Sequence, residues 1–187
     1  MNDPKNPGRL KVSPQMVSGG LLQVFDLGIL IMGDSGVGKS ETALELISRG
    51  HKFVTDDVTV LTRNSKGKII GSAPDLSKDF MEIRGLGIIN IREIFGDAFI
   101  LQKTTIDFIV ELKEWEEGKD YDRLGLTNYG THLLLDESVP CISIPVAPGR
   151  NMANLIEVAC KVHLLKIKGY HAPKEIKDKL EKILTSE

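Results

Sequence analysis

The spacing of hydrophobic positions changes several times along the chain, and each change predicts a different element. Residues 1–20 hold several prolines and glycines with little periodicity, whereas Leu22 to Phe25 indicate a strand and Asp26 a turn. The unbroken apolar run Gly28–Met32 predicts a strand that is buried on both faces. Apolar residues then recur at helical spacing before Gly50, a typical helix stop. They are Ala43, Leu44, Leu46 and Ile47. We therefore expect a strand, a loop and a helix in direct succession.

Four further segments have the composition of strands. Val58–Thr62 and Lys68–Gly71 flank Asn64–Gly67, a typical hairpin loop, so we expect these two strands to be antiparallel. Residues 105–112 and 141–146 are the other two, because both are rich in β-branched and apolar side chains.

The second half of the chain carries a charged loop and two helical patterns. Residues 113–128 are charged and contain glycine, so we expect a mobile loop there. Apolar positions past Arg150 fall on one helix face, and Pro173 is typical of the first turn of a second helix. Together these elements predict an α/β fold, with a mixed sheet, flanking helices and C-terminal helices. We divide the chain into a flexible entry or linker remnant, 1–20, and one domain, 21–187.

Composition narrows the class of partner. The net charge is −2 and the pI about 6.1, so the sequence gives no broad basic surface for nucleic acid or an anionic membrane. No apolar run approaches the roughly 18 residues of a membrane span. Cys141 and Cys160 lie in apolar runs, which favours buried reduced thiols over a disulfide bridge. We expect a cytoplasmic protein that binds neither nucleic acid nor membrane.

The segment between the buried strand and the helix has the complete phosphate-binding loop pattern. It is Gly33-Asp-Ser-Gly-Val-Gly-Lys39-Ser40, and strand before with helix after is the context that the pattern requires. Glycines let successive N–H groups point into one hollow at the positive end of the helix, where phosphate binds. The lysine neutralises the outer phosphates, and the serine hydroxyl can ligate Mg²⁺. A plain glycine-rich turn would explain neither the lysine nor the spacing. The predicted nucleotide-binding residues are Gly33, Asp34, Ser35, Gly36, Val37, Gly38, Lys39 and Ser40.

A pair of acidic residues follows the loop. Asp56 and Asp57 come just after the apolar pair Phe53–Val54, which indicates a strand end near the mouth of the loop. Carboxylates there could hold Mg²⁺ or take a proton from an acceptor hydroxyl. The alternative is a solvated aspartate pair that opens a turn. If the segment is a strand, the two side chains face opposite sides and only one looks toward Lys39.

Several motifs together resemble the HPr kinase/phosphorylase family. They are the loop with Glu41, Gly50–Asp57, Glu82–Ile89, Tyr121–Gly125 and Pro148–Met152. The resemblance runs from about residue 20 to 170 and covers the C-terminal catalytic domain of that family. Family members usually carry a further N-terminal domain, which this sequence lacks. The resemblance also suggests a homo-oligomer, a hexamer, to which the C-terminal helices could contribute contacts.

The resemblance implies a serine kinase that transfers phosphate from ATP to HPr, the small phosphocarrier of bacterial sugar transport. It also implies removal of that phosphate by inorganic phosphate, which yields pyrophosphate. By motif, Asp57 is the proton acceptor and Lys39 steadies the transferring group. Ser40 and Glu82 hold Mg²⁺, and Arg123 reaches the phosphates from the mobile loop. Ile144–Gly149 match the segment linked to dephosphorylation. By the residues alone, Glu82 and Arg84 could simply pair on a solvated strand face, and Arg123 could be an ordinary loop charge.

One position departs from the family pattern. Family members usually show a His-Gly pair about twenty residues before the loop lysine, and this sequence has Ser18–Gly19. A histidine there could tune the protonation of a nearby aspartate, whereas serine supplies no titrating cation. The balance between kinase and phosphorylase activity is therefore open.

Two other functional classes fit parts of the sequence. One is a nucleotide-binding regulatory module that has lost turnover, which the absent histidine favours; Asp57, Glu82 and Arg123 argue against it, because a sensor needs no base. The other is an NTPase whose acceptor is water. The sequence offers no obvious glutamine- or arginine-bearing switch segment soon after Asp57, which argues against this class. The physiological acceptor is also open, since carriers related to HPr serve nitrogen regulation as well as sugar uptake.

Overall fold

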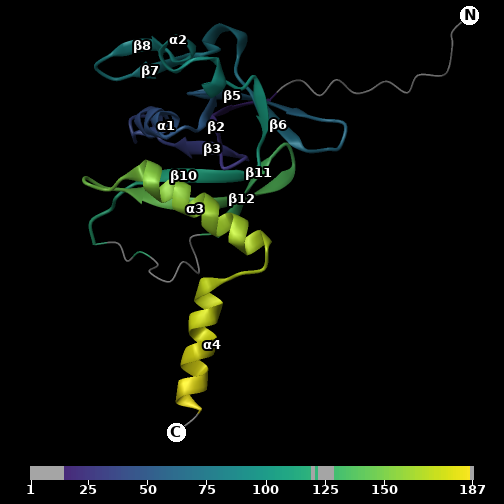
Figure 1. Cartoon of the computed structure of the whole chain (residues 1–187), viewed down its shortest axis with the longest axis vertical. Helices are drawn as coiled ribbons and strands as arrows, with labels where there is room; N and C mark the ends of the chain where they lie inside the picture. Colours follow the sequence, from purple (N-terminus) through teal and green to yellow (C-terminus); the bar gives the residue numbers. More distant parts are fainter. Residues whose placement is uncertain (1–14, 119–120, 122–128, 186–187) are drawn as a thin grey trace, which may run out of the picture.

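The computed structural model describes residues 15–118, 121 and 129–185, and its centre is a six-stranded mixed sheet (Figure 1). The strand order is β11-β12-β10-β3-β2-β4, in which β3, β10 and β12 are mutually parallel and the other pairings are antiparallel. The strands are β2 (Gly20–Val24), β3 (Leu27–Gly33), β4 (Lys52–Thr55), β10 (Phe108–Glu114), β11 (Tyr129–Leu134) and β12 (Glu137–Val146). The predicted α/β fold with a mixed sheet is confirmed.

A second sheet covers one face of the first. Its order is β1-β5-β6-β9, and all its pairings are antiparallel. The strands are β1 (Gln15–Ser18), β5 (Val58–Arg63), β6 (Ile69–Ser72) and β9 (Lys103–Thr105). The β5–β6 hairpin confirms the predicted antiparallel pair. The prediction of a flexible entry was wrong for residues 15–20, because β1 pairs along β5 and Gly20 begins β2.

Helices and a small hairpin complete the described part of the chain. The helices are α1 (Lys39–Ser48), α2 (Ile91–Phe95), α3 (Met152–Ile167) and α4 (Ala172–Leu184), with short turns η1 (Asp75–Ser77) and η2 (Asp97–Phe99). The hairpin is β7 (Phe80–Ile83) and β8 (Gly87–Asn90). Figure 1 shows α1 between this hairpin and the central sheet, and α4 projecting away from the rest of the molecule. No described helix combines the length and apolarity that crossing a membrane requires.

The middle of the central sheet is buried on both faces, which explains the unbroken apolar run in β3. Ile29 and Ile31 belong to the core on the helix side with α1 and α3, whereas Leu30 belongs to the core on the β5–β6 side. Alternating side chains of one strand therefore enter two different cores. Cys141 and Cys160 are buried free thiols, as predicted, and burial raises the pKa of the Cys160 thiol to about 12.

Candidate phosphate-binding site

The phosphate-binding loop joins β3 to α1 at the carboxyl end of the parallel strands. Its entry is tight: a Cβ on Gly33 would lie 2.4 Å from the carbonyl oxygen of Leu112 in β10, so a larger residue cannot fit there. Val37 is buried and anchors the middle of the loop. Gly38 is the N-cap of α1 with φ of 97°, a left-handed conformation that favours glycine. The loop thus stands at the positive end of a ten-residue helix.

Lys39 spans the loop. Its Nζ donates hydrogen bonds to the carbonyl oxygens of Gly33 and Asp34, both at 2.9 Å. An ammonium group has three N–H donors, so one remains for a phosphate oxygen. The charge is therefore held over the hollow by the backbone of the loop itself.

Asp56 is tied to the first turn of α1. Ser40 Oγ donates a hydrogen bond to Asp56 Oδ2 at 3.0 Å, and the N–H of Glu82 points to the same oxygen at 3.4 Å. The side chain is buried, and among the described residues Asp56 Oδ1 has no hydrogen-bond partner. Burial raises the pKa of Asp56, and the hydrogen bond from Ser40 opposes that shift. Burying a carboxylate oxygen without a hydrogen-bond partner costs free energy unless a bound ligand interacts with that oxygen.

Asp57 is exposed, whereas the adjacent Asp56 is buried. Both aspartates lie in the bend between β4 and β5, and both side chains line the same cavity. The alternation argument, which held only if the segment was a strand, does not apply to the pair, because the strand ends at Thr55. Alternation no longer applies once the backbone turns.

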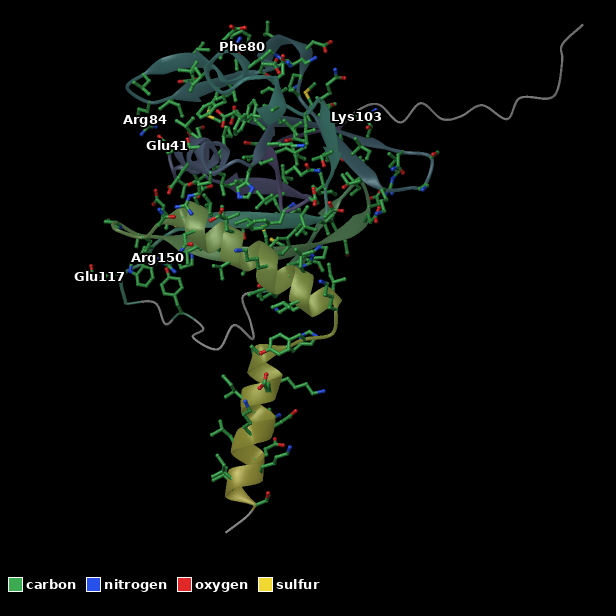
Figure 2. All side chains as sticks on the ribbon, viewed as in Figure 1. Glu41, Phe80, Arg84, Lys103, Glu117 and Arg150 are labelled. Atoms are coloured by element: carbon green, nitrogen blue, oxygen red, sulfur yellow. The ribbon has the colours of Figure 1, made fainter. Side chains whose placement is uncertain are left out.

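A cavity of about 210 Å³ lies over the loop. It is lined by Ser35, Gly36, Gly38, Lys39, Ser40, Glu41, Asp56, Asp57, Glu82 and Arg84. Figure 2 shows that Arg84 and Glu41 lie at one edge of the molecule. Glu82 and Arg84 do not form an ion pair with each other, so the simple surface pair that the sequence left open is not what the structure shows.

The cavity offers oxygen ligands of the kind that Mg²⁺ prefers. The Ser40 hydroxyl and the Asp56 carboxylate touch each other, and Glu82 lines the same cavity. Among the described residues no cluster of three or more acidic, histidine or cysteine side chains could hold a metal by itself. Mg²⁺ is usually held by one or two protein groups together with phosphate oxygens and waters. Ser40, Asp56 and Glu82 would hold it here.

The structure thus brings together the predicted residues of the loop with Asp57 and Glu82. Arg123 lies outside the described residues. Two residues that the sequence analysis did not assign, Arg84 and Glu41, also line the cavity. The sequence signal for Arg84 was the alternation of apolar Met81 and Ile83 with charged Glu82 and Arg84, because side chains two residues apart in a strand lie on one face.

Ser18, where the family usually has histidine, lies close to the aspartate pair. It is opposite Val58 in the β1–β5 pairing, and the N–H of Gly19 donates to the carbonyl oxygen of Asp57 at 2.7 Å. The position is therefore next to Asp57, which directly precedes β5.

A strand, a glycine-rich loop and a helix that present Lys39, Ser40 and nearby carboxylates define a P-loop phosphate-binding protein. The HPr Serine kinase C-terminal domain family matches residues 11–180, and the chain belongs to this family. The chain is 48% identical over 177 residues to the HPr kinase/phosphorylase of Peptoclostridium acidaminophilum, covering 94% of this chain and 57% of that protein. Identity to the HPr kinase/phosphorylase of Bacillus licheniformis is 45% over 168 residues, covering 90% and 54%.

A solved structure gives the same picture of the fold. The Hpr(Ser) kinase/phosphatase from Coxiella burnetii matches with a TM-score of 0.77 and 33% identity, covering 87% of this chain and 98% of that chain. The chain spans a little over half the length of the curated relatives that it matches. The family model that matches describes the C-terminal domain of HPr serine kinases.

Proposed function

We propose that the chain is an ATP-dependent serine kinase acting on HPr, and that it also dephosphorylates phospho-HPr with inorganic phosphate. The observation that carries the proposal is the single cavity in which the loop, Lys39, the Ser40–Asp56 contact and Asp57 meet. A cation, a base and metal ligands around one phosphate site are the parts that phosphoryl transfer requires. Family membership supports HPr as the acceptor.

In the forward reaction Asp57 accepts the proton of the acceptor serine hydroxyl as its oxygen bonds to the γ-phosphorus. The bond from that phosphorus to the bridging oxygen of ADP breaks, and Lys39 stabilises the charge on the outer phosphates. Mg²⁺, held by Ser40, Asp56 and Glu82, neutralises further phosphate charge when bound. In dephosphorylation, an oxygen of inorganic phosphate bonds to the phosphorus of phosphoserine as the bond from that phosphorus to the serine oxygen breaks. Asp57 takes a proton from the attacking phosphate and donates it to the serine oxygen, so the products are serine and pyrophosphate.

Two features support Asp57 over Asp56 as the proton acceptor. Asp57 is exposed to the cavity, where a serine of another protein can approach. Asp56 is buried and already accepts a hydrogen bond from Ser40, which suits it to the metal. Arg123 keeps its proposed role at the phosphates by resemblance alone.

The test is incubation of the chain with γ-labelled ATP, Mg²⁺ and HPr, beside an HPr-related nitrogen carrier and a reaction without acceptor. We expect acid-stable label on HPr, as phosphoserine gives, and release of pyrophosphate when phospho-HPr meets inorganic phosphate. If only the nitrogen carrier were labelled, that carrier and not HPr would be the acceptor of the phosphoryl group. Release of phosphate to water without labelled protein would favour the NTPase alternative, and binding without turnover would favour the regulatory module.

We also propose a homo-oligomer. Family resemblance suggests a hexamer, and α4 supports an interface because it exposes an apolar stripe away from the core, formed by Ile176, Leu180 and Leu184.

A further inference from the structure

Arg84 stands at the turn of the β7–β8 hairpin, directly beside the phosphate-binding loop. Its Nη2 lies 3.4 Å and its Nη1 3.8 Å from the position that a Cβ on Gly36 would occupy. Within the described part of the chain, no other heavy atom outside the neighbouring residues is that close to this position. Figure 2 shows Arg84 at the same edge as Glu41 in the first turn of α1. The guanidinium therefore lies over the middle of the loop, within van der Waals contact of the position that a Cβ at residue 36 would occupy.

The hairpin turn is held firmly against the loop. Met81 and Ile83 are buried in the core that also contains α1. The N–H of Leu86 donates to the carbonyl oxygen of Ile83 at 3.0 Å, which closes the turn. Between the two buried residues, the N–H of Glu82 points to the Asp56 carboxylate. The backbone that carries Arg84 is thus positioned by the site itself.

The charge of Arg84 is uncommitted within the described part of the chain. No hydrogen bond or ion pair joins its guanidinium to a described residue, although Glu41, Asp57 and Glu82 line the same cavity. A guanidinium has five N–H donors in a planar fork that matches phosphate oxygens in pairs. An arginine next to a loop built for anions is therefore available to a phosphate rather than used by the fold.

We propose that Arg84 contacts the outermost phosphate of the bound nucleotide and stabilises its charge during transfer, as a catalytic residue. The inference deepens the proposed function and rests on it. The Lys39 ammonium is hydrogen-bonded to the carbonyl oxygens of Gly33 and Asp34, whereas the Arg84 guanidinium lies beside Gly36. The two cations therefore lie over different parts of the loop. In the transfer, the acceptor oxygen bonds to phosphorus as the bond to the leaving diphosphate breaks. Arg84 exchanges no proton in this step.

The first test compares nucleotide affinities. Arg84→Ala should weaken MgATP binding about 10-fold or more, because a charged hydrogen bond to the outermost phosphate is lost, and should leave MgADP binding within about 2-fold. Arg84→Lys should recover part of the loss, since it keeps the charge without the fork. Lys66→Ala is the matched control: it removes one cation from the turn of another hairpin, outside the cavity. Thermal melting should be the same for all four proteins, because Arg84 is exposed.

The second test measures transfer to HPr, which Arg84→Ala should slow about 10²-fold or more and Lys66→Ala should not change. Equal loss of ATP and ADP affinity in Arg84→Ala, or wild-type affinity and rate, would overturn the inference. The two hypotheses fail separately. A wild-type chain that does not label HPr refutes the proposed function, yet its ATP-to-ADP preference still reports on Arg84. If Arg84→Ala and Lys66→Ala label HPr at the same rate, the role of Arg84 is refuted and the proposed function still stands.

Discussion

Adjacent aspartates have acquired different environments because the chain bends between them. Asp56 is buried, accepts from Ser40 Oγ and has its pKa raised by burial, whereas Asp57 is exposed to the cavity. A carboxylate that is buried beside a serine at a helix N-terminus suits a metal, and an exposed one suits an incoming hydroxyl. We therefore expect the pair to divide the two tasks that the sequence left open.

Replacing each aspartate should separate these tasks. Asp57→Asn keeps the size but removes the basic lone pair, so transfer in both directions should fall about 10²- to 10⁴-fold with nucleotide affinity nearly intact. Asp56→Asn should slow transfer less and should mainly weaken the Mg²⁺ dependence of nucleotide binding. Rate assays in both directions and titrations at several Mg²⁺ concentrations measure this. If the two variants exchanged their effects, the assignment would be reversed; full rates in both would exclude base catalysis by the pair.

At the scale of elements, a polar network joins α1 to the start of α3 on the side away from the cavity. Arg49 Nη1 donates to Glu157 Oε2 and His51 Nε2 contacts Glu157 Oε1, both at 2.8 Å. Arg49 also donates to Asn151, the N-cap of α3, whose amide donates in turn to Glu45. Because α1 begins in the phosphate-binding loop, this network fixes the helix that presents Lys39 and Ser40.

The network should make stability depend on acid pH. Burial raises the pKa of Glu157, but the hydrogen bonds from His51 and Arg49 outweigh it, and the net pKa is lowered. A lowered carboxyl pKa stabilises the fold above the unfolded value of about 4.3, and that stability is lost as the pH falls through the folded pKa. Glu157→Gln should therefore lower Tm by about 2–4 °C at pH 7, and the difference should shrink below about pH 4.

Thermal melts at several values between about pH 3 and about pH 7 measure this difference in Tm, because the carboxyl group of Glu157 titrates within that interval. Glu114→Gln is the control, because Glu114 is exposed and has no ion pair among the described residues. A Tm difference that stays constant with pH would show that Glu157 acts through packing and not through its charge.

Elements with long or unbroken patterns could be predicted, and those fixed by distant pairing could not. The apolar run of β3 and the helical spacing of α1 can be recognised from the local sequence alone. By contrast, β1 is only four residues long and forms by pairing with β5. Its own sequence, next to several prolines, has no clear strand pattern, so it was not predicted. The predicted strand 105–112 is two elements, since β9 ends at Thr105 and β10 begins at Phe108. Each belongs to a different sheet, which no local pattern records.

The candidate site divides in the same way. The loop pattern identified Gly33–Ser40, because its chemistry is continuous in sequence. The Ser40–Asp56 contact joins residues sixteen apart, and the approach of Arg84 to Gly36 joins residues still farther apart. Those contacts depend on how the β7–β8 hairpin packs on α1, and packing is set by the whole core.

At the scale of the whole molecule, α4 extends from the body and buries none of its residues (Figure 1). Its exposed Ile176 and Leu180 lie one turn apart on one stripe. If this stripe is covered by another copy, Ile176→Asp with Leu180→Asp should convert an oligomer into smaller species in sedimentation velocity, with the melting of the body unchanged. Lys182→Asp, a charge change elsewhere on α4, is the control. A monomeric wild-type chain, or an unchanged mass in the double variant, would contradict the interface.

The central claim is that residues 33–40 bind the phosphates of the nucleotide, and calorimetric titration with MgATP tests it most directly. The wild-type chain should bind MgATP. Lys39→Ala should weaken that binding about 10-fold or more, because the ammonium that the loop carbonyls hold in place is lost. Lys52→Ala, an exposed lysine on β4, should bind like the wild type. MgATP affinity that is the same in Lys39→Ala as in the wild type would contradict the account.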